Sequence, residues 1–251
     1  MISLKEIVSE ICSLVRVCGK VMLNADREKM AIDIKSGVAD LVTEYDKGIQ
    51  EQLKVGLKNI LPEAKFIGEE GSDDELTDDG YAFIVDPIDG TTNFIKDYHY
   101  SAISVALLEG KEVVAGVVYN PYLDEAFYAI KSEGAFCNGK KISVSSQPID
   151  KALVVFGSSP YDKSLFPKTI EVLSKYFYKA LDIRRSGSAA LDLCCVASGR
   201  ADLFFELQIS PCDFAAGKLL VEEAGGVVTT LDGAPLSFEG KTSILAKNNV
   251  I

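Results

Sequence analysis

The sequence contains a single histidine, His99, and no tryptophan among its 251 residues. One histidine excludes a histidine-rich zinc site and any mechanism that needs two histidines. The six cysteines show no CxxC spacing, and two of them, Cys194 and Cys195, are adjacent. Such cysteines indicate reduced, mostly buried thiols rather than a disulfide framework.

Long apolar runs and a surplus of basic residues are also missing. The apolar runs are too short to cross a bilayer, and Glu6, Glu10 and Arg16 interrupt the apolar pattern at the N-terminus. We therefore expect an amphipathic first helix in a cytoplasmic protein rather than a signal peptide. The 26 Lys and Arg against 37 Asp and Glu give a net charge of −11. This charge argues against non-specific binding to nucleic acid or to an anionic membrane.

Much of the acidity is local. Seven acidic residues fall within residues 69–79, which read EEGSDDELTDD. From Asp73 to Asp79 this composition predicts a solvated loop.

Hydrophobic periodicity organises the first part of the chain. Apolar residues at helical spacing predict one helix over residues 4–24 and a second that begins at Thr43 and ends before Pro62. Asp46, three residues after Thr43, is typical of a capping arrangement. From Tyr81 onward, short apolar runs separated by turn signals predict an antiparallel meander. The expected strands cover residues 82–85, 102–108, 113–119 and 125–130.

After about Pro148 strands and helices alternate, which favours βαβ units and a mostly parallel sheet. The expected strands cover residues 153–157, 182–185, 201–206, 227–230 and 243–246, and the expected helices cover 166–178, 188–198 and 212–224. We therefore divide the chain into an N-terminal part, residues 1–148, and a C-terminal part, residues 149–251. With no repeat or linker between them, the two parts are expected to form one compact layered body.

The stretch IVDPIDGTTNF, residues 84–94, places two carboxylates at the end of a predicted strand. Pro87 sets a turn, so that Asp86 and Asp89 lie on the same side with the carbonyl of Ile88 between them. Such oxygen ligands suit a hard divalent cation. The alternative is an ordinary Asp-Pro-x-Asp-Gly turn, and residue types alone leave both interpretations open.

The residues that follow suit an anion. Gly90, Thr91 and Thr92 are predicted to begin a helix, whose free N–H groups and dipole favour a phosphate. Gly90 lets the phosphate approach the backbone, and Thr91 is a candidate for positioning an attacking water. Metal and phosphate side by side would be the arrangement for metal-assisted phosphoryl hydrolysis.

Three further carboxylates add to this hypothesis. Glu69 lies in FIGEEGS, Asp213 in the first turn of a predicted helix, and Asp46 in DLVTEYD. Taken singly, each is explained as readily by capping, the helix dipole or surface solvation. Taken together, they are the additional ligands that a two- or three-metal site would need.

The order and spacing of four motifs resemble those of the inositol monophosphatase family. The motifs are GEE, DPIDGTTNF, GSAALDLC and PCDFAAGKLLVEEAGG, and the resemblance extends over nearly the whole chain. It implies an αβαβα layered fold, which combines the antiparallel N-terminal sheet with the C-terminal α/β part. It also implies a magnesium-dependent, lithium-sensitive phosphomonoesterase that is usually a homodimer.

The resemblance also implies roles for individual residues. Glu69, Asp86 and the carbonyl of Ile88 would hold a first Mg²⁺, and Asp86, Asp89 and Asp213 a second, while Glu69 would help a third ion through water. Thr91 and Asp46 would orient and deprotonate the attacking water, and the N–H groups of Gly90 and Thr91 would bind phosphate. The substrate contacts carried over are Asp89, Gly187, Ser188, Ala189 and Glu206, with Ser158 as a further candidate.

The sequence departs from the family pattern at three places. Many relatives have Trp-Asp where this chain has Cys212-Asp213, so a smaller side chain must pack beside the last metal ligand. His99 lies in a changed segment, NFIKDYHY, and is interpreted as a local packing or surface residue. Relatives commonly continue into a last helix, whereas this sequence stops at Ile251, which suggests a shortened end.

Several functions share this core. The leading hypothesis is hydrolysis of inositol monophosphate, a phosphorylated sugar alcohol. Relatives with the same core act on fructose 1,6-bisphosphate, 3′-phosphoadenosine 5′-phosphate or histidinol phosphate, and a bisphosphate would require extra cations such as Arg184 and Arg185. Some bacterial relatives bind the transcription machinery, so a role as an RNA polymerase-binding protein is a hypothesis from another class.

Overall fold

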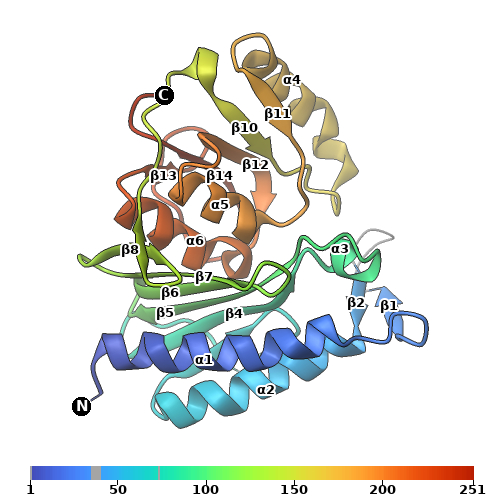
Figure 1. Ribbon diagram of the computed structural model, residues 1–251, viewed down its shortest axis with the longest axis vertical. Helices are drawn as coiled ribbons and strands as arrows, with labels where there is room; N and C mark the ends of the chain where they lie inside the picture. Colours follow the sequence, from blue (N-terminus) through green and yellow to red (C-terminus); the bar gives the residue numbers. More distant parts are fainter. Residues whose placement is uncertain (1, 35–40, 73) are drawn as a thin grey trace.

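The computed structural model describes residues 2–34, 41–72 and 74–251. Five layers follow one another in Figure 1. Helices α1 (Leu4–Leu23) and α2 (Glu44–Ile60) cover one face of a seven-stranded sheet. Helices α5 (Ala189–Ala197) and α6 (Pro211–Glu223) separate it from a five-stranded sheet, whose far side is covered by α4 (Phe166–Phe177). The expected αβαβα layered fold is confirmed.

The seven-stranded sheet has the order β3-β4-β5-β6-β7-β8-β9. Its strands are β3 (Lys65–Gly68), β4 (Tyr81–Asp89), β5 (Ala102–Glu109), β6 (Glu112–Asn120), β7 (Glu125–Ile130), β8 (Gly134–Cys137) and β9 (Lys140–Ile142). From β4 to β9 every pairing is antiparallel, which confirms the predicted meander. The edge strand β3 pairs with β4 in parallel and was not predicted. A separate small hairpin joins β1 (Ile32–Ile34) to β2 (Leu41–Thr43).

The five-stranded sheet has the order β11-β10-β12-β14-β13. Its strands are β10 (Leu153–Phe156), β11 (Asp182–Arg184), β12 (Leu203–Ile209), β13 (Val227–Thr229) and β14 (Thr242–Lys247). The predicted mostly parallel arrangement holds for β11, β10 and β12. It fails for β14, which runs antiparallel to both β12 and β13. The reason is that no helix crosses over between β13 and β14, and a parallel pairing requires such a crossover.

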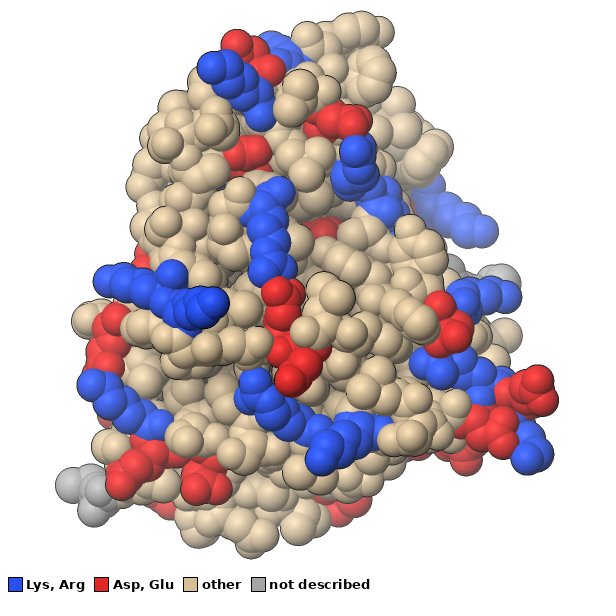
Figure 2. All heavy atoms as spheres, in the orientation of Figure 1, with Lys and Arg blue, Asp and Glu red and all other residues tan. Residues whose placement is uncertain are grey.

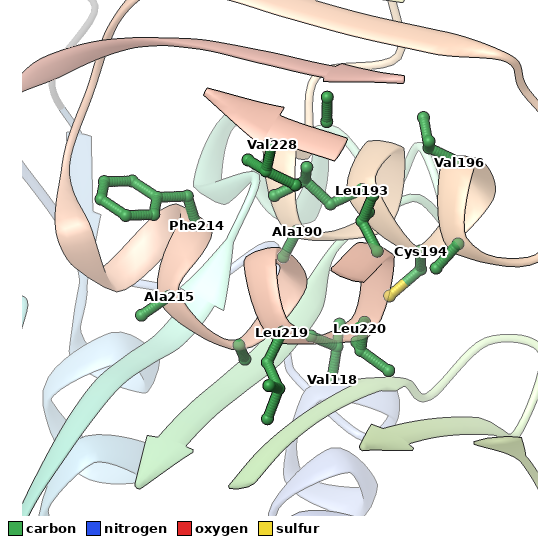
Figure 3. Packing of buried hydrophobic residues seen from close by; sticks show 14 of the residues in the cluster. Val118, Ala190, Leu193, Cys194, Val196, Phe214, Ala215, Leu219, Leu220 and Val228 are labelled. Carbon is green, nitrogen blue, oxygen red and sulfur yellow. The ribbon is translucent and has the colours of Figure 1, made fainter. Parts of the chain in front are cut away.

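The central core lies between the two sheets, around α5 and α6 (Figure 3). Ala190, Leu193, Phe214 and Leu220 are fully or almost fully buried, since both helices are apolar on nearly every side. Burying one large apolar side chain contributes about 1.5–3 kcal/mol. At Gly116 of β6 a β-carbon would lie 2.9 Å from the carbonyl oxygen of Ala216, so a glycine is needed where α6 touches the sheet.

Charge is distributed rather than concentrated on the face in Figure 2, where basic and acidic side chains are interspersed. Ion pairs include Lys111 with Asp78, both exposed, and Arg200 with the partly buried Glu125. Asp73 of the predicted acidic loop lies outside the described residues, while the carboxylate of Asp74 accepts a hydrogen bond from the N–H of Phe66 at 2.8 Å. Among the described residues, no helix has the length and apolarity required to span a membrane.

Candidate active site

Asp86 and Asp89 lie close together because β4 contains a bulge. Asp86 is opposite Ser104 of β5 and Asp89 is opposite Ala102, so three steps along β4 match two along β5. Residues three apart in a regular strand point to opposite faces, and the one extra residue brings them to the same face. Pro87 occupies the bulge, where its missing N–H costs no ladder hydrogen bond. The predicted turn is therefore wrong, because the strand continues to Asp89 through a bulge.

Asp213 joins these two aspartates from the first turn of α6. One carboxylate oxygen from each of Asp86, Asp89 and Asp213 lies within 4.8 Å of the other two. Asp213 is held by the N–H of Ser210, which donates to its Oδ2 at 3.0 Å as part of a capping box. The helix dipole also favours a negative charge at this position. Asp86 and Asp213, which are 127 positions apart in the sequence, thus belong to one cluster of hard oxygen donors.

Burial makes this cluster electrostatically costly. Desolvation raises the pKa of Asp86 well above its ordinary value, and the charges of Glu69, Asp89 and Asp213 add to the shift. Burial also raises the pKa of Asp89 to about 6 and the pKa of Asp213 well above its usual range. A divalent cation among the three carboxylates would relieve both the desolvation and the mutual repulsion. The donor set therefore fits a hard metal ion.

Glu69 lies beside the cluster of three aspartates. It follows β3, and its N–H donates to the carbonyl of Val85 at 3.1 Å, which places it beside the end of β4. Its charge acts on Asp86, Asp89 and Asp213, and it lines the cavity next to them.

Asp46 and Thr91 meet at the edge of the cluster. The Thr91 hydroxyl lies 3.2 Å from Oδ1 of Asp46 and 3.1 Å from the carbonyl oxygen of Ile88. The other oxygen of Asp46 accepts from the N–H of Thr43 at 2.8 Å, which confirms the predicted capping arrangement at the start of α2. Asp46 is fully buried, and this burial raises its pKa. One carboxylate thus both caps α2 and holds the Thr91 hydroxyl.

Gly90 allows the chain to turn from β4 into the short helix α3 (Thr91–Ile95), as predicted. Its φ of 86° lies in the left-handed region. A β-carbon there would lie 3.0 Å from the carbonyl oxygen of Gly187 and 3.2 Å from that of Tyr100. Gly90 and Thr91 line a cavity of about 300 Å³ that also contains the carboxylate cluster.

The loop before α5 packs against Asp89 and Gly90 and lines the same cavity. Gly187, Ser188 and Ala189, the substrate contacts carried over from the resemblance, all line the cavity. The Ser188 hydroxyl, however, donates to Oδ2 of Asp89, which also accepts from the N–H of Ala190 at 2.9 Å. Ser188 therefore fixes the position of Asp89.

Glu206 lies at a second bulge. It was predicted to close a strand, but β12 continues to Ile209 with a register shift after Glu206. The side chain is buried and lines the cavity, and burial raises its pKa to about 7. Its Oε1 accepts from the N–H of Ser159 at 2.7 Å. Ser158 is not among the described residues that line this cavity, and its hydroxyl lies 3.3 Å from Nη2 of Arg185.

Four further residues contribute to the site, and the sequence assigned none of them a defined role. Arg185, one of two candidate cations, lines the cavity, whereas Arg184 is exposed and pairs with Asp182. Asp192 is buried at the cavity wall, and its Oδ1 accepts from the Ser186 hydroxyl at 2.5 Å. The sequence did contain a signal for Asp192, since it is an acidic residue inside the apolar run SAALDLC. Ser159 and Tyr161 depend on the path of a loop, for which the sequence held no signal.

Two of the departures from the family pattern, Cys212 and His99, have defined contacts in the structure. Cys212 packs against the central core, and its carbonyl accepts from the Ser104 hydroxyl at 3.3 Å. His99 is exposed, stacks on the ring of Tyr122 at 4.9 Å and contacts Asp97. These contacts agree with the interpretation of His99 as a surface residue.

Comparison with known proteins defines the relationship. A family model described as the inositol monophosphatase family matches residues 3–250. Inositol monophosphatase 2 of Solanum lycopersicum is 44% identical over 213 residues, which cover 82% of this chain and 80% of that protein. The IMPase of Thermotoga maritima superposes with a TM-score of 0.85 at 33% identity, over 96% of this chain and 91% of its own. An IMPase/NADP phosphatase complexed with NADP and Ca²⁺ superposes with a TM-score of 0.89 at 28% identity, over 100% of this chain and 93% of its own.

The layered fold with a carboxylate cluster beside a small cavity is that of a metal-dependent phosphatase. With the match over residues 3–250, the chain belongs to the inositol monophosphatase family. It is therefore an enzyme of the phosphatase class.

Proposed function

We propose that this phosphatase hydrolyses inositol monophosphate to inositol and phosphate in a Mg²⁺-dependent reaction. The observation that carries the proposal is the group of Asp86, Asp89 and Asp213, whose oxygens lie within 4.8 Å of one another at one end of the cavity. The names of the relatives support inositol monophosphate as the substrate.

Mg²⁺ is proposed because all available donors are hard oxygens. Asp86, Asp89 and Asp213 would hold one ion, and Glu69, Asp86 and the carbonyl of Ile88 another, with Glu69 assisting a third. When bound, Mg²⁺ lowers the pKa of coordinated water and neutralises charge on phosphoryl oxygens. The Ca²⁺ complex of a 28% identical relative supports a divalent cation in this family.

Thr91 and Asp46 are proposed to position the attacking water. The Thr91 hydroxyl points to Asp46 Oδ1 at 3.2 Å, so Asp46 can take a proton from Thr91 while the Thr91 oxygen accepts one from water. The Ile88 carbonyl, 3.1 Å away, fixes the same hydroxyl from a second side. The N–H groups of Gly90 and Thr91 are proposed to bind the phosphate, since both residues line the cavity.

The remainder of the substrate is proposed to lie against Gly187, Ala189 and Glu206, which line the same cavity. Glu206 offers one carboxylate oxygen to Ser159, so its other oxygen can accept from a sugar-alcohol hydroxyl. Asp89 and Ser188 would support this part of the substrate site indirectly, because the hydrogen bond between them fixes the loop before α5. Ser158 would contribute only through Arg185 at the rim.

A second candidate substrate class is favoured by Arg185. This arginine lines the cavity, and among the described residues no carboxylate lies within ion-pair distance of it. A cation here suits an additional anionic group, as in fructose 1,6-bisphosphate or 3′-phosphoadenosine 5′-phosphate. The relative solved with NADP supports this alternative. Histidinol phosphate gains no support from this arginine, because it carries no second anionic group.

Three wider proposals follow from the family resemblance: a homodimer, a cytoplasmic location and inhibition by Li⁺. The division into residues 1–148 and 149–251 is proposed as two parts of one body.

A second role in binding RNA polymerase is tested by a pull-down with wild type and with Asp213→Asn. Recovery of polymerase by both would support that role.

A substrate panel tests the proposed function. Phosphate release is measured from inositol 1-phosphate, fructose 1,6-bisphosphate, 3′-phosphoadenosine 5′-phosphate and histidinol phosphate, each with Mg²⁺ and with Mg²⁺ plus Li⁺. The proposal predicts the highest kcat/KM for inositol 1-phosphate and inhibition by Li⁺. A higher kcat/KM for a bisphosphate that falls in Arg185→Gln would instead establish the second candidate.

A further inference from the structure

Tyr161 is an aromatic residue at the mouth of the cavity. It lies in the loop that follows β10 and lines the same cavity as the carboxylate cluster and Glu206. Its exposed fraction is nevertheless 54%. A large aromatic side chain that both lines a binding cavity and meets solvent is typical of a residue that contacts a ligand.

The loop that carries Tyr161 is fixed in place. Ser159 has a φ of 44°, a left-handed conformation that is unfavourable for a residue other than glycine. The N–H of Ser159 donates to Glu206 at 2.7 Å, and its hydroxyl donates to the carbonyl of Gln208 at 3.0 Å. The Ser159 carbonyl accepts from the N–H of Asp162 at 3.0 Å. These bonds hold a strained turn that orients Tyr161 before any ligand binds.

The hydroxyl of Tyr161 lies within electrostatic reach of the carboxylate cluster that lines the same cavity. Burial raises the pKa of this hydroxyl, and the charges of Asp213 and Glu69 raise it further, so the group stays protonated. It is therefore available as a hydrogen-bond donor. The ammonium of Lys241 lies 5.5 Å from the ring centroid, a cation–π distance that favours this ring orientation.

We propose that Tyr161 is a specificity-determining residue that selects phosphates of cyclic polyols over short acyclic ones. The inference rests on the proposed function and deepens it. The ring offers an apolar surface for the carbon face of a six-membered polyol, and the hydroxyl donates to one of its oxygens. Glu206 provides an acceptor in the same cavity, so a cyclic polyol can satisfy donor and acceptor together. A three-carbon phosphate ester offers no ring for Tyr161 and fewer hydroxyls for Glu206, so it gains less from both groups.

Two substrates and two variants test this selection. The kcat and KM of wild type, Tyr161→Phe and Tyr161→Ala are measured with inositol 1-phosphate and with glycerol 2-phosphate. We expect Tyr161→Ala to raise the KM for inositol 1-phosphate about tenfold, as expected for the loss of one pocket contact. Its kcat/KM for glycerol 2-phosphate should stay within about twofold of the wild-type value. Tyr161→Phe, which keeps the ring, should give an intermediate KM for inositol 1-phosphate.

Tyr178→Ala is the matched control, since Tyr178 is 86% exposed at the end of α4 and does not line the cavity. Equal losses on both substrates would assign Tyr161 a structural role and overturn the inference, as would an unchanged KM for inositol 1-phosphate in both variants. Thermal unfolding identifies a variant that has lost its fold. If Tyr161→Ala is unfolded, the KM of Tyr161→Phe for inositol 1-phosphate decides. If the wild type releases phosphate from neither substrate, the proposed function fails together with the inference.

Discussion

The hydroxyl of Thr91 lies 3.2 Å from the carboxylate of Asp46, and this contact joins the start of α2 to the end of β4. Because Asp46 lies in the first turn of α2 and closes its capping box with Thr43, the hydroxyl is anchored to a rigid helix. The Ile88 carbonyl holds the same hydroxyl at 3.1 Å. The contact therefore couples the proposed water-positioning pair directly to the backbone between the two aspartates of the bulge.

Replacing Thr91 by Val is expected to lower kcat about a hundredfold, because a positioned acid–base group contributes about 10²–10⁴-fold to the rate. KM should change little, since the phosphate contacts proposed here are backbone N–H groups. Thr91→Ser keeps the hydroxyl and should retain most of the activity. Steady-state kinetics on inositol 1-phosphate check both variants. Equal activity of Thr91→Val and Thr91→Ser would remove Thr91 from the mechanism.

Asp86→Asn and Asp213→Asn are expected to abolish turnover without unfolding the protein. Each removes a metal ligand worth several kcal/mol of transition-state stabilisation, so activity should fall by at least about a hundredfold. Each also removes one of several buried charges that repel one another. Thermal unfolding in EDTA should therefore occur at or above the wild-type temperature. Retained activity in either variant would show that the ligand assignment is wrong.

Stability in the absence of metal should fall as the pH rises from 5 to 7.5. An acid whose pKa is raised by folding keeps its proton longer in the folded state, so stability is lost between the unfolded and the folded pKa. The window for Asp89 runs from 3.8 to about 6, and the window for Glu206 from 4.5 to about 7. Since one pKa unit is worth about 1.4 kcal/mol, the part of each window above pH 5 corresponds to about 1.4 kcal/mol for Asp89 and about 3 kcal/mol for Glu206.

Thermal unfolding in EDTA at pH 5 and pH 7.5 measures this effect. Asp89→Asn should show a smaller decrease than the wild type, which separates Asp89 from the general effect of net charge. Adding Mg²⁺ at pH 7.5 should raise the unfolding temperature of the wild type, because the metal binds the ionised carboxylates. A melting temperature that rises from pH 5 to pH 7.5 in EDTA would contradict the electrostatic description.

Glu206→Gln should raise the KM for inositol 1-phosphate about tenfold and leave kcat within about threefold, since a lost substrate hydrogen bond acts mainly on binding. Gln keeps an oxygen that can accept from Ser159, so the loop should stay in place. Ser159→Ala, which removes only the hydroxyl, is the control for loop disorder. A large decrease in kcat with unchanged KM for Glu206→Gln would exclude a substrate-binding role.

Local signals in the sequence predicted most of the fold. The helices α1 and α2 and strands β4 to β7 follow from apolar periodicity and turn residues, with bounds that differ by at most a few residues except at β4. The position of β14 between β12 and β13 could not be predicted, because it depends on how the chain returns after β13. The short strands β1 and β3 hold too few residues for a periodic pattern.

The candidate site was predicted unevenly. The pairing of Asp86 with Asp89 was a local inference, although it assigned a turn where the structure has a bulge. The approach of Asp213 was only a hypothesis from residue types until the family resemblance supported it, because no local pattern relates residues so far apart. Tyr161 was missed, since its place at the cavity depends on the strained turn at Ser159 and the contact with Glu206.

The most direct test of the central claim is release of phosphate from inositol 1-phosphate by the purified wild-type protein, measured with Mg²⁺ and then with EDTA. We predict turnover with Mg²⁺, none with EDTA, and none with Mg²⁺ in Asp213→Asn. No release in the presence of Mg²⁺, or release that EDTA leaves unchanged, would contradict a metal-dependent inositol monophosphatase built on Asp86, Asp89 and Asp213.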